Sequence, residues 1–348
     1  MKKIATLTFN RANNYGAMLQ CYALKTTLNL LGARTSVINY KPRARKLTLR
    51  EFIKRTVFMP WLIYVNNQFE AFRKPYLMDM PFVKRTHLPD LNDKFDLFIA
   101  GSDQVWNMDG GSKDASYLLD FVNSDFKKYS YSASMGKTEI NLEEKEILAR
   151  YLKLFQVVSV REASAVPLAK ELSGKEDVRA DIDPTLLLSK ESWRKTAVMP
   201  KEKDFILLYL MSNNSAIIGF ARDLARKTGL KLIMLSTSPV PYKGVKVICP
   251  TPQEWLGYFL NAKYIVTNSF HGLAFSINFN KDFFVDLLPP PSKVNSRLEN
   301  LLDLTNLRSR LISAGANLDT PAPDWAEVNA KLAAEKEKSL SYLRSMAE

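Results

Sequence analysis

The residue best suited to acid–base chemistry in this chain is His271, which lies in the segment Ser269-Phe-His-Gly272. The chain has only two histidines, and the other, His87, lies in a loop with no comparable setting. A short apolar run, residues 264–267, precedes the segment, and an apolar helical pattern follows it. Asn268 or Ser269 is suited to cap that helix. His271 and Gly272 are then expected in the first turn, where amides and the helix dipole favour an anion.

A second polar cluster, Gly101-Ser-Asp-Gln-Val-Trp106, follows the buried run 95–100. Asp103 is either a local cap or a general base. Gln104 is expected to hydrogen-bond sugar hydroxyls, and Trp106 is expected to stack on a pyranose ring. The composition of this cluster favours sugar recognition.

Two further clusters follow predicted strands. Arg161 and Glu162 come directly after the run 157–160, and an arginine there either pairs with its neighbour or captures a carboxylate or phosphate. Asn13-Asn-Tyr-Gly16 opens the first predicted helix. It is interpreted either as ordinary capping or as a backbone cradle for substrate, since glycine permits close approach.

The elements that must position these side chains alternate between strand and helix. Strands are predicted near residues 3–9 and 35–39, with a helix between them, and such a βαβ unit starts a parallel sheet. The pattern restarts after a polar stretch. We therefore predict an α/β protein of two Rossmann-like domains facing a cleft. The predicted boundaries are an N-terminal domain over 1–188, a linker over 189–203, and a C-terminal domain with a C-terminal helix over 204–348.

Composition narrows the function classes. At 348 residues and 46% hydrophobic content the chain is expected to form two ordinary cores. Its two cysteines show no metal or CxxC spacing, and no apolar run is long enough to span a membrane, so a cytoplasmic location without structural zinc is expected. There is no P-loop and no GxGxxG motif.

The net charge of +13 concentrates in residues 41–55, which hold seven basic residues and one glutamate. This segment is most simply a solvated face, and it also fits an anionic membrane surface, a phosphorylated substrate or nucleic acid. No nucleic-acid-binding motif accompanies it, so nucleic acid is not expected as a partner. Peripheral association with the inner face of a membrane is the partner hypothesis that we keep.

Taken together, these segments resemble the polysaccharide pyruvyl transferase family. The matching stretches occur in the family's order: Asn14-Tyr-Gly-Ala-Met-Leu-Gln20, Phe95 to Asn107, Val160-Arg-Glu162, Asp183-Pro-Thr-Leu-Leu187, Asn261 to Gly272, and Arg297-Leu-Glu-Asn-Leu-Leu302. Each stretch is weak alone, but the ordered set is specific and spans most of the chain.

The resemblance implies a fold similar to GT-B glycosyltransferases, with phosphoenolpyruvate as donor and a sugar, glycan or lipid-linked glycan as acceptor. The expected reaction builds a pyruvate ketal on a bacterial glycan or its precursor, without metal or cofactor. His271 is the expected general acid and Asp103 the expected base. The other expected contacts are Arg161, Ser269, Gly272 and Arg297 to the donor, and Asn14, Tyr15, Gln104 and Trp106 to the acceptor.

Two alternatives stay open at this stage. One is a GT-B-like glycosyltransferase that uses a nucleotide sugar, which needs a nucleotide site in the C-terminal half. The other is a protein of the same fold that binds a glycan or an anion without catalysis.

Overall fold

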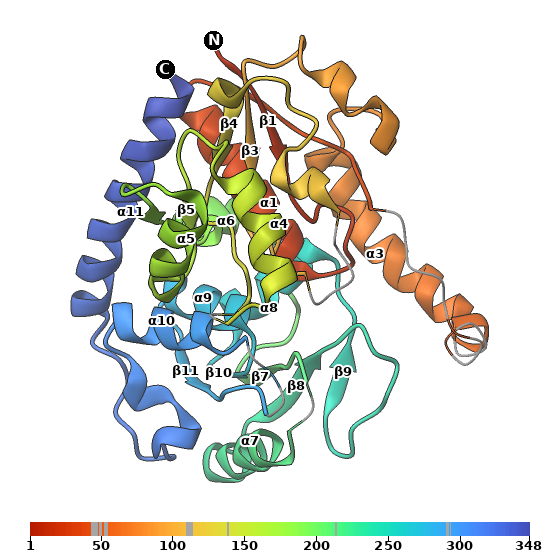
Figure 1. The fold of residues 1–348 in the computed structure, drawn as a ribbon. Helices are drawn as coiled ribbons and strands as arrows, with labels where there is room; N and C mark the ends of the chain where they lie inside the picture. The colour runs from red at the N-terminus through yellow and green to blue at the C-terminus, as the bar shows by residue number, and fades with distance from the viewer. Residues whose placement is uncertain are drawn as a thin grey trace. The chain divides into compact units, whose positions relative to one another are not determined.

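The structure is a computed structural model, drawn as a ribbon in Figure 1. It describes residues 1–42, 48, 51, 55–108, 114–137, 139–212, 214–289, 292 and 294–348. Contacts between residues group the chain into two units. The first unit comprises Met1–Phe52, Arg73–Leu187 and Glu335–Glu348, and the second comprises Ile53–Phe72 and Leu188–Ala334.

The first unit is built on a four-stranded parallel sheet in the order β2-β1-β3-β4. These strands are Arg34–Val37, Lys3–Leu7, Leu97–Ala100 and Lys128–Ser130. A short parallel pair, β5 (Ser159–Val160) and β6 (Arg179–Ala180), continues beyond β4 through isolated bridges. The predicted βαβ unit is confirmed, because β1 and β2 run parallel with α1 (Tyr15–Leu30) between them in sequence.

The core of the first unit lies between the sheet and two helices, α4 (Leu142–Leu152) and α5 (Val166–Ser173), which pack against each other. A capping box starts α4, in which the side chains of Asn141 and Glu144 each accept the backbone amide of the other residue. The periodic leucines of these helices therefore supply the layer that covers the sheet.

The second unit has a five-stranded parallel sheet in the order β11-β10-β7-β8-β9. These strands are Asp282–Val285, Tyr264–Thr267, Phe205–Tyr209, Lys231–Leu235 and Lys246–Ile248. Because all five run parallel, the loops that follow them emerge at one edge of the sheet, where ligands bind in open α/β folds.

The helices of the second unit are α6 (Lys190–Thr196), α7 (Ser215–Thr228), α8 (Pro252–Asn261), α9 (Phe270–Asn278) and α10 (Ser296–Leu304). The sequence predicts a polar connection over 189–203, yet α6 lies inside it and packs on α8. The reason is Trp193, which is fully buried with its ring centroid 5.1 Å from that of Phe275.

Two long helices, α3 (Met59–Leu77) and α11 (Trp325–Ala347), each contribute to both units. The sequence predicts residues 325–346 as a surface helix, but Ser339, Tyr342 and Leu343 of α11 are buried. In the first unit Ser339 donates to Asp181 (3.0 Å) and Tyr342 donates to the carbonyl of Ser130 (2.9 Å). The two units defined by residue contacts therefore differ from the domain boundaries that the sequence predicts. No helix in the described part of the chain is long and apolar enough to cross a membrane.

The sequence also predicts that Pro60 separates two helices. In the structure residues 55–57 are helical and Phe58 is in a turn, so a helix break does lie just before Pro60. Pro60 itself lies in the first turn of α3, where a proline needs no intrahelical amide bond. Several residues just before it, 49–50 and 52–54, lie outside the described residues.

Candidate functional site

The turn between β10 and α9 carries the predicted histidine. Ser269 is the N-cap of α9, and its hydroxyl accepts the amide of Gly272 at 3.3 Å. Asn268, the other predicted cap, instead binds the loop after β7: it accepts from the amide of Met211 (2.8 Å) and donates to the carbonyl of Ser212 (3.0 Å). Asn268 therefore ties together two loops at the carboxyl edge of the second sheet.

The amides of Ser269 and Gly272 do not serve the predicted donor site, because both already have acceptors within the turn. Ser269 donates its amide to Oγ1 of Thr267 at 3.1 Å, and Gly272 donates to the Ser269 hydroxyl. This corrects the prediction that these two amides hold the donor. Their hydrogen bonds fix the turn that carries His271.

Gly272 is required by the packing of this turn. A Cβ atom at this position would lie 2.2 Å from Oγ1 of Thr267. Thr267 cannot easily move, because its hydroxyl donates to the carbonyl of Tyr209 (2.6 Å) while it accepts from Ser269. The glycine therefore lets α9 begin directly against the end of β10.

His271 is 7% exposed, and the centroid of its ring lies 5.2 Å from that of Phe270. The Arg297 guanidinium, from the first turn of α10, lies 5.8 Å from the centroid of the same phenylalanine ring. Arg297 also donates from Nε to the carbonyl of Val294 at 3.3 Å. The second unit thus brings His271 and Arg297, two of the predicted residues, to one aromatic ring.

In the first unit, the loop after β3 holds Asp103 in the left-handed region, with φ of 75°. Its carbonyl accepts the amides of Val105 (2.8 Å) and Ser134 (2.9 Å), and its Oδ1 accepts the amide of Gln104 (2.8 Å). The loop after β3 is therefore fastened to the loop after β4, and Asp103 combines a capping role with a place in a charged cluster.

That cluster surrounds Arg161, whose side chain is buried. Its guanidinium donates to Asp183 at 2.9 Å and lies 3.5 Å from a carboxylate oxygen of Glu162 and 3.8 Å from one of Asp103. The interpretation of Arg161 as an intramolecular ion pair is therefore correct. The sequence interpretation places Arg161 at the donor, and the structure shows this arginine paired with carboxylates. Its contact with the donor stays a prediction.

The electrostatics of the cluster follow from this arrangement. Burial lowers the pKa of Arg161, but the carboxylates of Glu162, Asp183 and Asp103 more than compensate, so its pKa lies above the ordinary value. One guanidinium facing these three carboxylates leaves an excess of negative charge when all are ionised. Such a cluster suits hydroxyl donors better than the phosphate of a donor substrate.

Gln104 has a polar group that the protein leaves unsatisfied. Within the part of the chain that the structure describes, its buried Nε2 has no hydrogen-bond acceptor. Gly136 lies beside this nitrogen, since a Cβ atom there would be 2.8 Å away, and its φ of +75° favours glycine. A buried donor without a partner is costly, and a ligand oxygen would relieve it.

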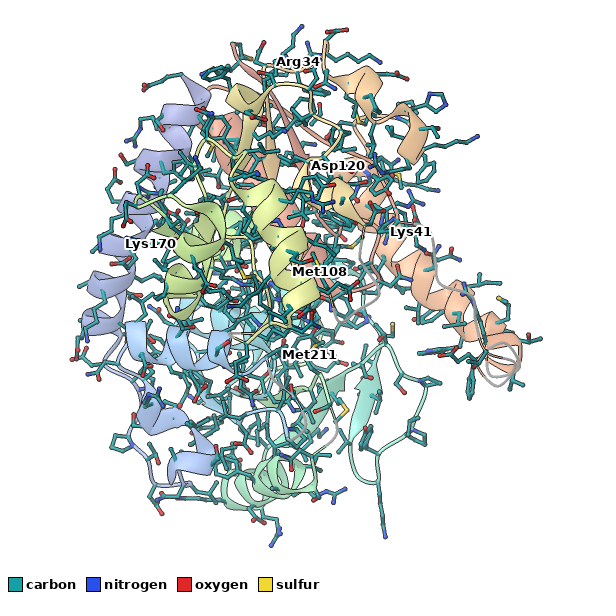
Figure 2. The ribbon with its side chains drawn as sticks, viewed as in Figure 1. Arg34, Lys41, Met108, Asp120, Lys170 and Met211 are labelled. Carbon is teal, nitrogen blue, oxygen red and sulfur yellow. The ribbon has the colours of Figure 1, made fainter. Side chains whose placement is uncertain are left out.

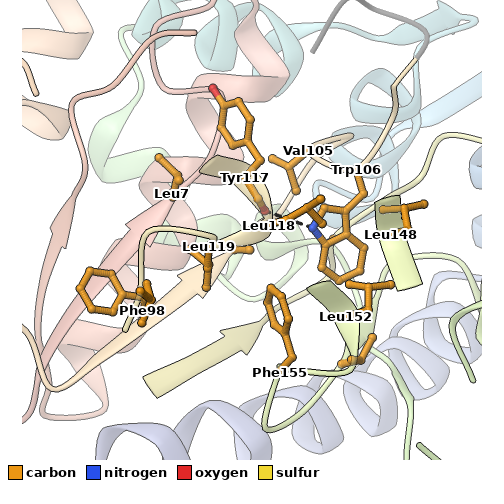
Figure 3. Packing of buried hydrophobic residues seen from close by; sticks show 14 of the residues in the cluster. Leu7, Phe98, Val105, Trp106, Tyr117, Leu118, Leu119, Leu148, Leu152 and Phe155 are labelled. Carbon is orange, nitrogen blue, oxygen red and sulfur yellow. Dashed lines mark hydrogen bonds between the residues drawn. The ribbon is translucent and has the colours of Figure 1, made fainter. Parts of the chain in front are cut away.

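Trp106 belongs to the hydrophobic core, as Figure 3 shows. Its indole is 2% exposed, packs edge-on against Phe155 at 5.8 Å between centroids, and donates from Nε1 to the carbonyl of Tyr117 at 3.2 Å. This corrects the prediction that Trp106 stacks on a sugar. The apolar pattern around it, rather than its place after a strand, decides its role.

Asn14 and Tyr15 lie at the start of α1. Asn14 is the N-cap, and its Oδ1 accepts the amide of Ala17 at 3.0 Å, which agrees with the capping interpretation. Tyr15 is 1% exposed. The loop before them is held by the buried Arg73, which donates to the carbonyl of Asn10 (3.0 Å) and to Oδ1 of Asn13 (3.0 Å).

The sequence interpretation missed two members of the first-unit cluster. Asp183, which is not among the predicted site residues, accepts from Arg161 and from the hydroxyl of Ser102 (3.2 Å). Ser134 donates to Glu162 at 2.7 Å. The run of serines in Ser130-Tyr-Ser-Ala-Ser134, at the end of β4, was the available signal.

Solved structures with similar folds define the class of this protein. The S. aureus MnaA–UDP complex matches with a TM-score of 0.50 at 17% identity, covering 99% of this chain and 91% of that one. An alpha-glucosyltransferase in complex with UDP and a 13-mer DNA containing an HMU base matches with a TM-score of 0.51 at 11% identity, covering 99% and 94%. With its two parallel-sheet units, the chain has a fold similar to that of GT-B glycosyltransferases.

A family model described as polysaccharide pyruvyl transferase matches residues 14–285. The chain therefore belongs to the polysaccharide pyruvyl transferase family, as the ordered sequence segments indicate. The match covers the loops that carry Asn14, Asp103, Arg161 and His271. Comparison with curated protein sequences found no match.

Proposed function

We propose that this transferase moves pyruvate from phosphoenolpyruvate to a sugar, as a ketal on a glycan or glycan precursor. The observation that carries the proposal is the pairing of His271 and Arg297 around Phe270, within a chain of this family. An imidazole 5.2 Å and a guanidinium 5.8 Å from the centroid of the same ring supply a proton donor and a fixed cation. The cation would bind the carboxylate or phosphate of the donor, and the proton donor would protonate its C3 atom.

The proposed reaction forms two C–O bonds at C2 of phosphoenolpyruvate, from two hydroxyls of one sugar. One proton is added to C3, which becomes a methyl group. The C2–O bond to phosphate breaks, and the second hydroxyl proton leaves with the phosphate. His271 is the proposed acid toward C3, and Asp103 is the proposed base toward an acceptor hydroxyl.

On the donor side, Arg297 is the proposed anion-binding residue. Ser269 and Gly272 act by holding the turn, since their amides are occupied within it. Arg161 acts in this proposal by keeping Asp103 in place, because its charge is already balanced by carboxylates. No metal or cofactor is part of the proposed reaction.

On the acceptor side, Gln104 and Asp103 are the proposed contacts. The buried Nε2 of Gln104 supplies a donor to a sugar oxygen, and the carboxylate of Asp103 supplies an acceptor beside it. Asn14 and Tyr15 remain proposed neighbours of the acceptor. A lipid-linked glycan is the proposed acceptor class if the chain works at the inner face of a membrane.

The test is phosphate release from phosphoenolpyruvate in the presence and absence of candidate glycans. We expect release that depends on the acceptor, and a loss of about 10²–10⁴-fold in rate for His271→Ala. His87→Ala is the matched control, because the chain's other histidine is exposed and lies beside Asp90. Equal rates for the two variants would remove His271 from the role of acid.

A binding measurement separates the two alternatives. Phosphoenolpyruvate should raise the melting temperature, while nucleotide sugars should not, because only a ligand of the native state stabilises it. Stabilisation by a nucleotide sugar alone would favour the glycosyltransferase alternative. Stabilisation by phosphoenolpyruvate or a glycan without phosphate release under any acceptor would favour the non-catalytic alternative.

A further inference from the structure

The side-chain carboxamide of Asn10 is buried without a hydrogen-bond partner. Asn10 is 0% exposed, and within the described residues neither its Nδ2 nor its Oδ1 atom has a partner. Of the described side chains, it alone has both of its polar atoms in that state. A buried carboxamide that makes no hydrogen bond is costly, so Asn10 needs a partner that the described protein does not supply.

The backbone around Asn10 is held in place by the buried Arg73. Nε of Arg73 donates to the carbonyl of Asn10 at 3.0 Å, and its Nη2 donates at 3.4 Å to the carbonyls of both Arg11 and Ala12. The amide of Asn10 donates to the carbonyl of Thr8 at 2.8 Å. The loop after β1 is therefore fixed through its main chain, and the Asn10 side chain takes no part in these bonds.

Asn10 lies at the same edge of the first sheet as Asp103. The strands β1 and β3 are neighbours in which Leu7 pairs with Ala100, and Asn10 and Asp103 each lie three residues beyond this pair. Because the two strands are parallel, the loops that follow them both leave the sheet at its carboxyl edge. Asn10 is therefore placed with the polar residues that follow β3.

A chain of hydrogen bonds joins these two loops. Gln20 of α1 donates from Nε2 to the hydroxyl of Thr8 (2.9 Å), and that hydroxyl donates to the carbonyl of Ser102 (2.7 Å). The hydroxyl of Ser102 donates in turn to Asp183 at 3.2 Å. Within the described part of the chain, the buried Oε1 of Gln20 has no donor. The loop after β1 is thus tied to the loop after β3, and Gln20 adds an unpaired acceptor at the tie.

The unpaired atoms indicate a neutral ligand that carries hydroxyl groups. Among the described residues, Asn10 leaves a donor and an acceptor unpaired, Gln20 leaves an acceptor and Gln104 leaves a donor. A hydroxyl group both donates and accepts, so a polyol suits such a set of carboxamides. The carboxylates around Arg161, one of which accepts from Ser102, already hold negative charge at this edge, which disfavours an anionic ligand.

We propose that Asn10 is a contact for the sugar acceptor. Its Nδ2 donates to one oxygen of the sugar, and its Oδ1 accepts from a hydroxyl group of the same ring. Because Asn10 is closed in by the protein, the side chains around it part to admit the sugar, and the new hydrogen bonds satisfy a carboxamide that was unpaired before. The identity of this sugar as the acceptor rests on the proposed function.

The first test is the stability of Asn10→Leu without ligand. Leucine has no polar atom to leave unpaired, so the melting temperature should rise by about 2–4 °C. Asn92→Leu is the matched control, because the buried Asn92 donates to the carbonyls of Pro89 (2.8 Å) and Phe121 (2.9 Å), the latter next to Asp120, which Figure 2 labels. Losing these bonds should lower the melting temperature by more than about 4 °C.

The second test is sugar binding, measured by ligand-observed NMR titration with the methyl glycosides of glucose, galactose, mannose and N-acetylglucosamine. Phosphoenolpyruvate is left out, so that the measurement does not depend on turnover. We expect the wild type to bind at least one glycoside. Asn10→Leu should bind it at least about tenfold more weakly, because two hydrogen bonds are lost. Asn92→Leu, measured below its melting temperature, should bind it like the wild type.

A higher melting temperature of Asn10→Leu together with weaker sugar binding supports the inference. An equal or lower melting temperature would overturn it, because the carboxamide would then have a structural partner such as a buried water. Unchanged sugar binding by Asn10→Leu, or no binding of any glycoside by the wild type, would overturn it as well. Binding that depends on Asn10 without phosphate release from phosphoenolpyruvate would refute the proposed function and leave Asn10 as a sugar contact.

Discussion

The guanidinium of Arg297 lies 5.8 Å from the centroid of the Phe270 ring, and this ring also contacts the neighbouring His271. The contact joins the first turns of α9 and α10, which follow different strands of the second sheet. A cation and an imidazole are thereby both placed against one aromatic ring that carries no charge itself.

Arg297→Ala is expected to weaken binding of phosphoenolpyruvate by about 10- to 100-fold, because a hydrogen bond to a charged group contributes about 1.5–3 kcal/mol. Titration calorimetry of the donor alone measures this. Arg308→Ala is the control, since Arg308 is half-exposed and pairs with Asp303 in the same unit. Unchanged donor affinity in Arg297→Ala would place the donor elsewhere.

Gly272→Ala is expected to destabilise the protein by about 1–3 kcal/mol, because the new methyl group overlaps the fixed hydroxyl of Thr267. Gly219→Ala is the matched control: this glycine lies inside α7, and a Cβ atom there meets nothing within 4 Å. Alanine should stabilise that helix by roughly 0.5–1 kcal/mol. Urea unfolding followed by circular dichroism checks both, and a change of the same sign in both variants would contradict the packing argument.

Arg161→Met is expected to cost about 3–5 kcal/mol of unfolding free energy, because it leaves Glu162 and Asp183 buried without their cation. Adding Asp183→Asn to this variant should recover part of the loss, since one uncompensated charge is removed. Urea unfolding of the single and double variants measures the recovery. A double variant less stable than Arg161→Met would show that Asp183 matters for its cap on Thr185 more than for its charge.

Lys281 is expected to make stability depend on alkaline pH. Burial, together with the nearby charges of Lys190, Arg194 and Lys263, lowers its pKa from 10.5 to about 8. Between pH 8 and 10.5 the unfolded chain binds more protons at this residue than the folded chain. The free energy of unfolding contributed by this group therefore rises with pH across that window.

In Lys281→Met this rise should be smaller than in the wild type, and unfolding free energies measured at both ends of the window give the difference. Lys201→Met, at an exposed position, should keep the wild-type rise. Equal pH dependence in all three proteins would show that Lys281 titrates alike in the folded and unfolded chains.

The positions of strands and caps were predictable from sequence because they depend on local patterns. The run at residues 264–267, the cap at Ser269 and the helix after it all appear as expected. The start of α4 is similar, since its capping box reads directly from Asn141 and Glu144. Such features depend only on the types of residues that are close together in the sequence.

The roles of side chains after the strands were less predictable, because they depend on partners distant in sequence. Trp106 follows a strand, as a sugar-stacking residue would, yet it is buried against Phe155. Arg161 was predicted to contact the donor, and its partner Asp183 lies 22 residues away in sequence. A polar residue after a strand either packs against protein partners or binds a ligand, and only the packed neighbours decide which.

The sequence by itself determined the two parallel α/β units, the family and the helix-start position of His271, since these follow from periodicity, capping chemistry and ordered motifs. The tertiary structure decided which backbone amides and charged side chains already have partners within the protein. It also decided that Phe270 joins His271 to Arg297 and that, among the described residues, the Asn10 carboxamide is buried without a partner. Those facts depend on long-range packing, which pairs groups that no local pattern relates.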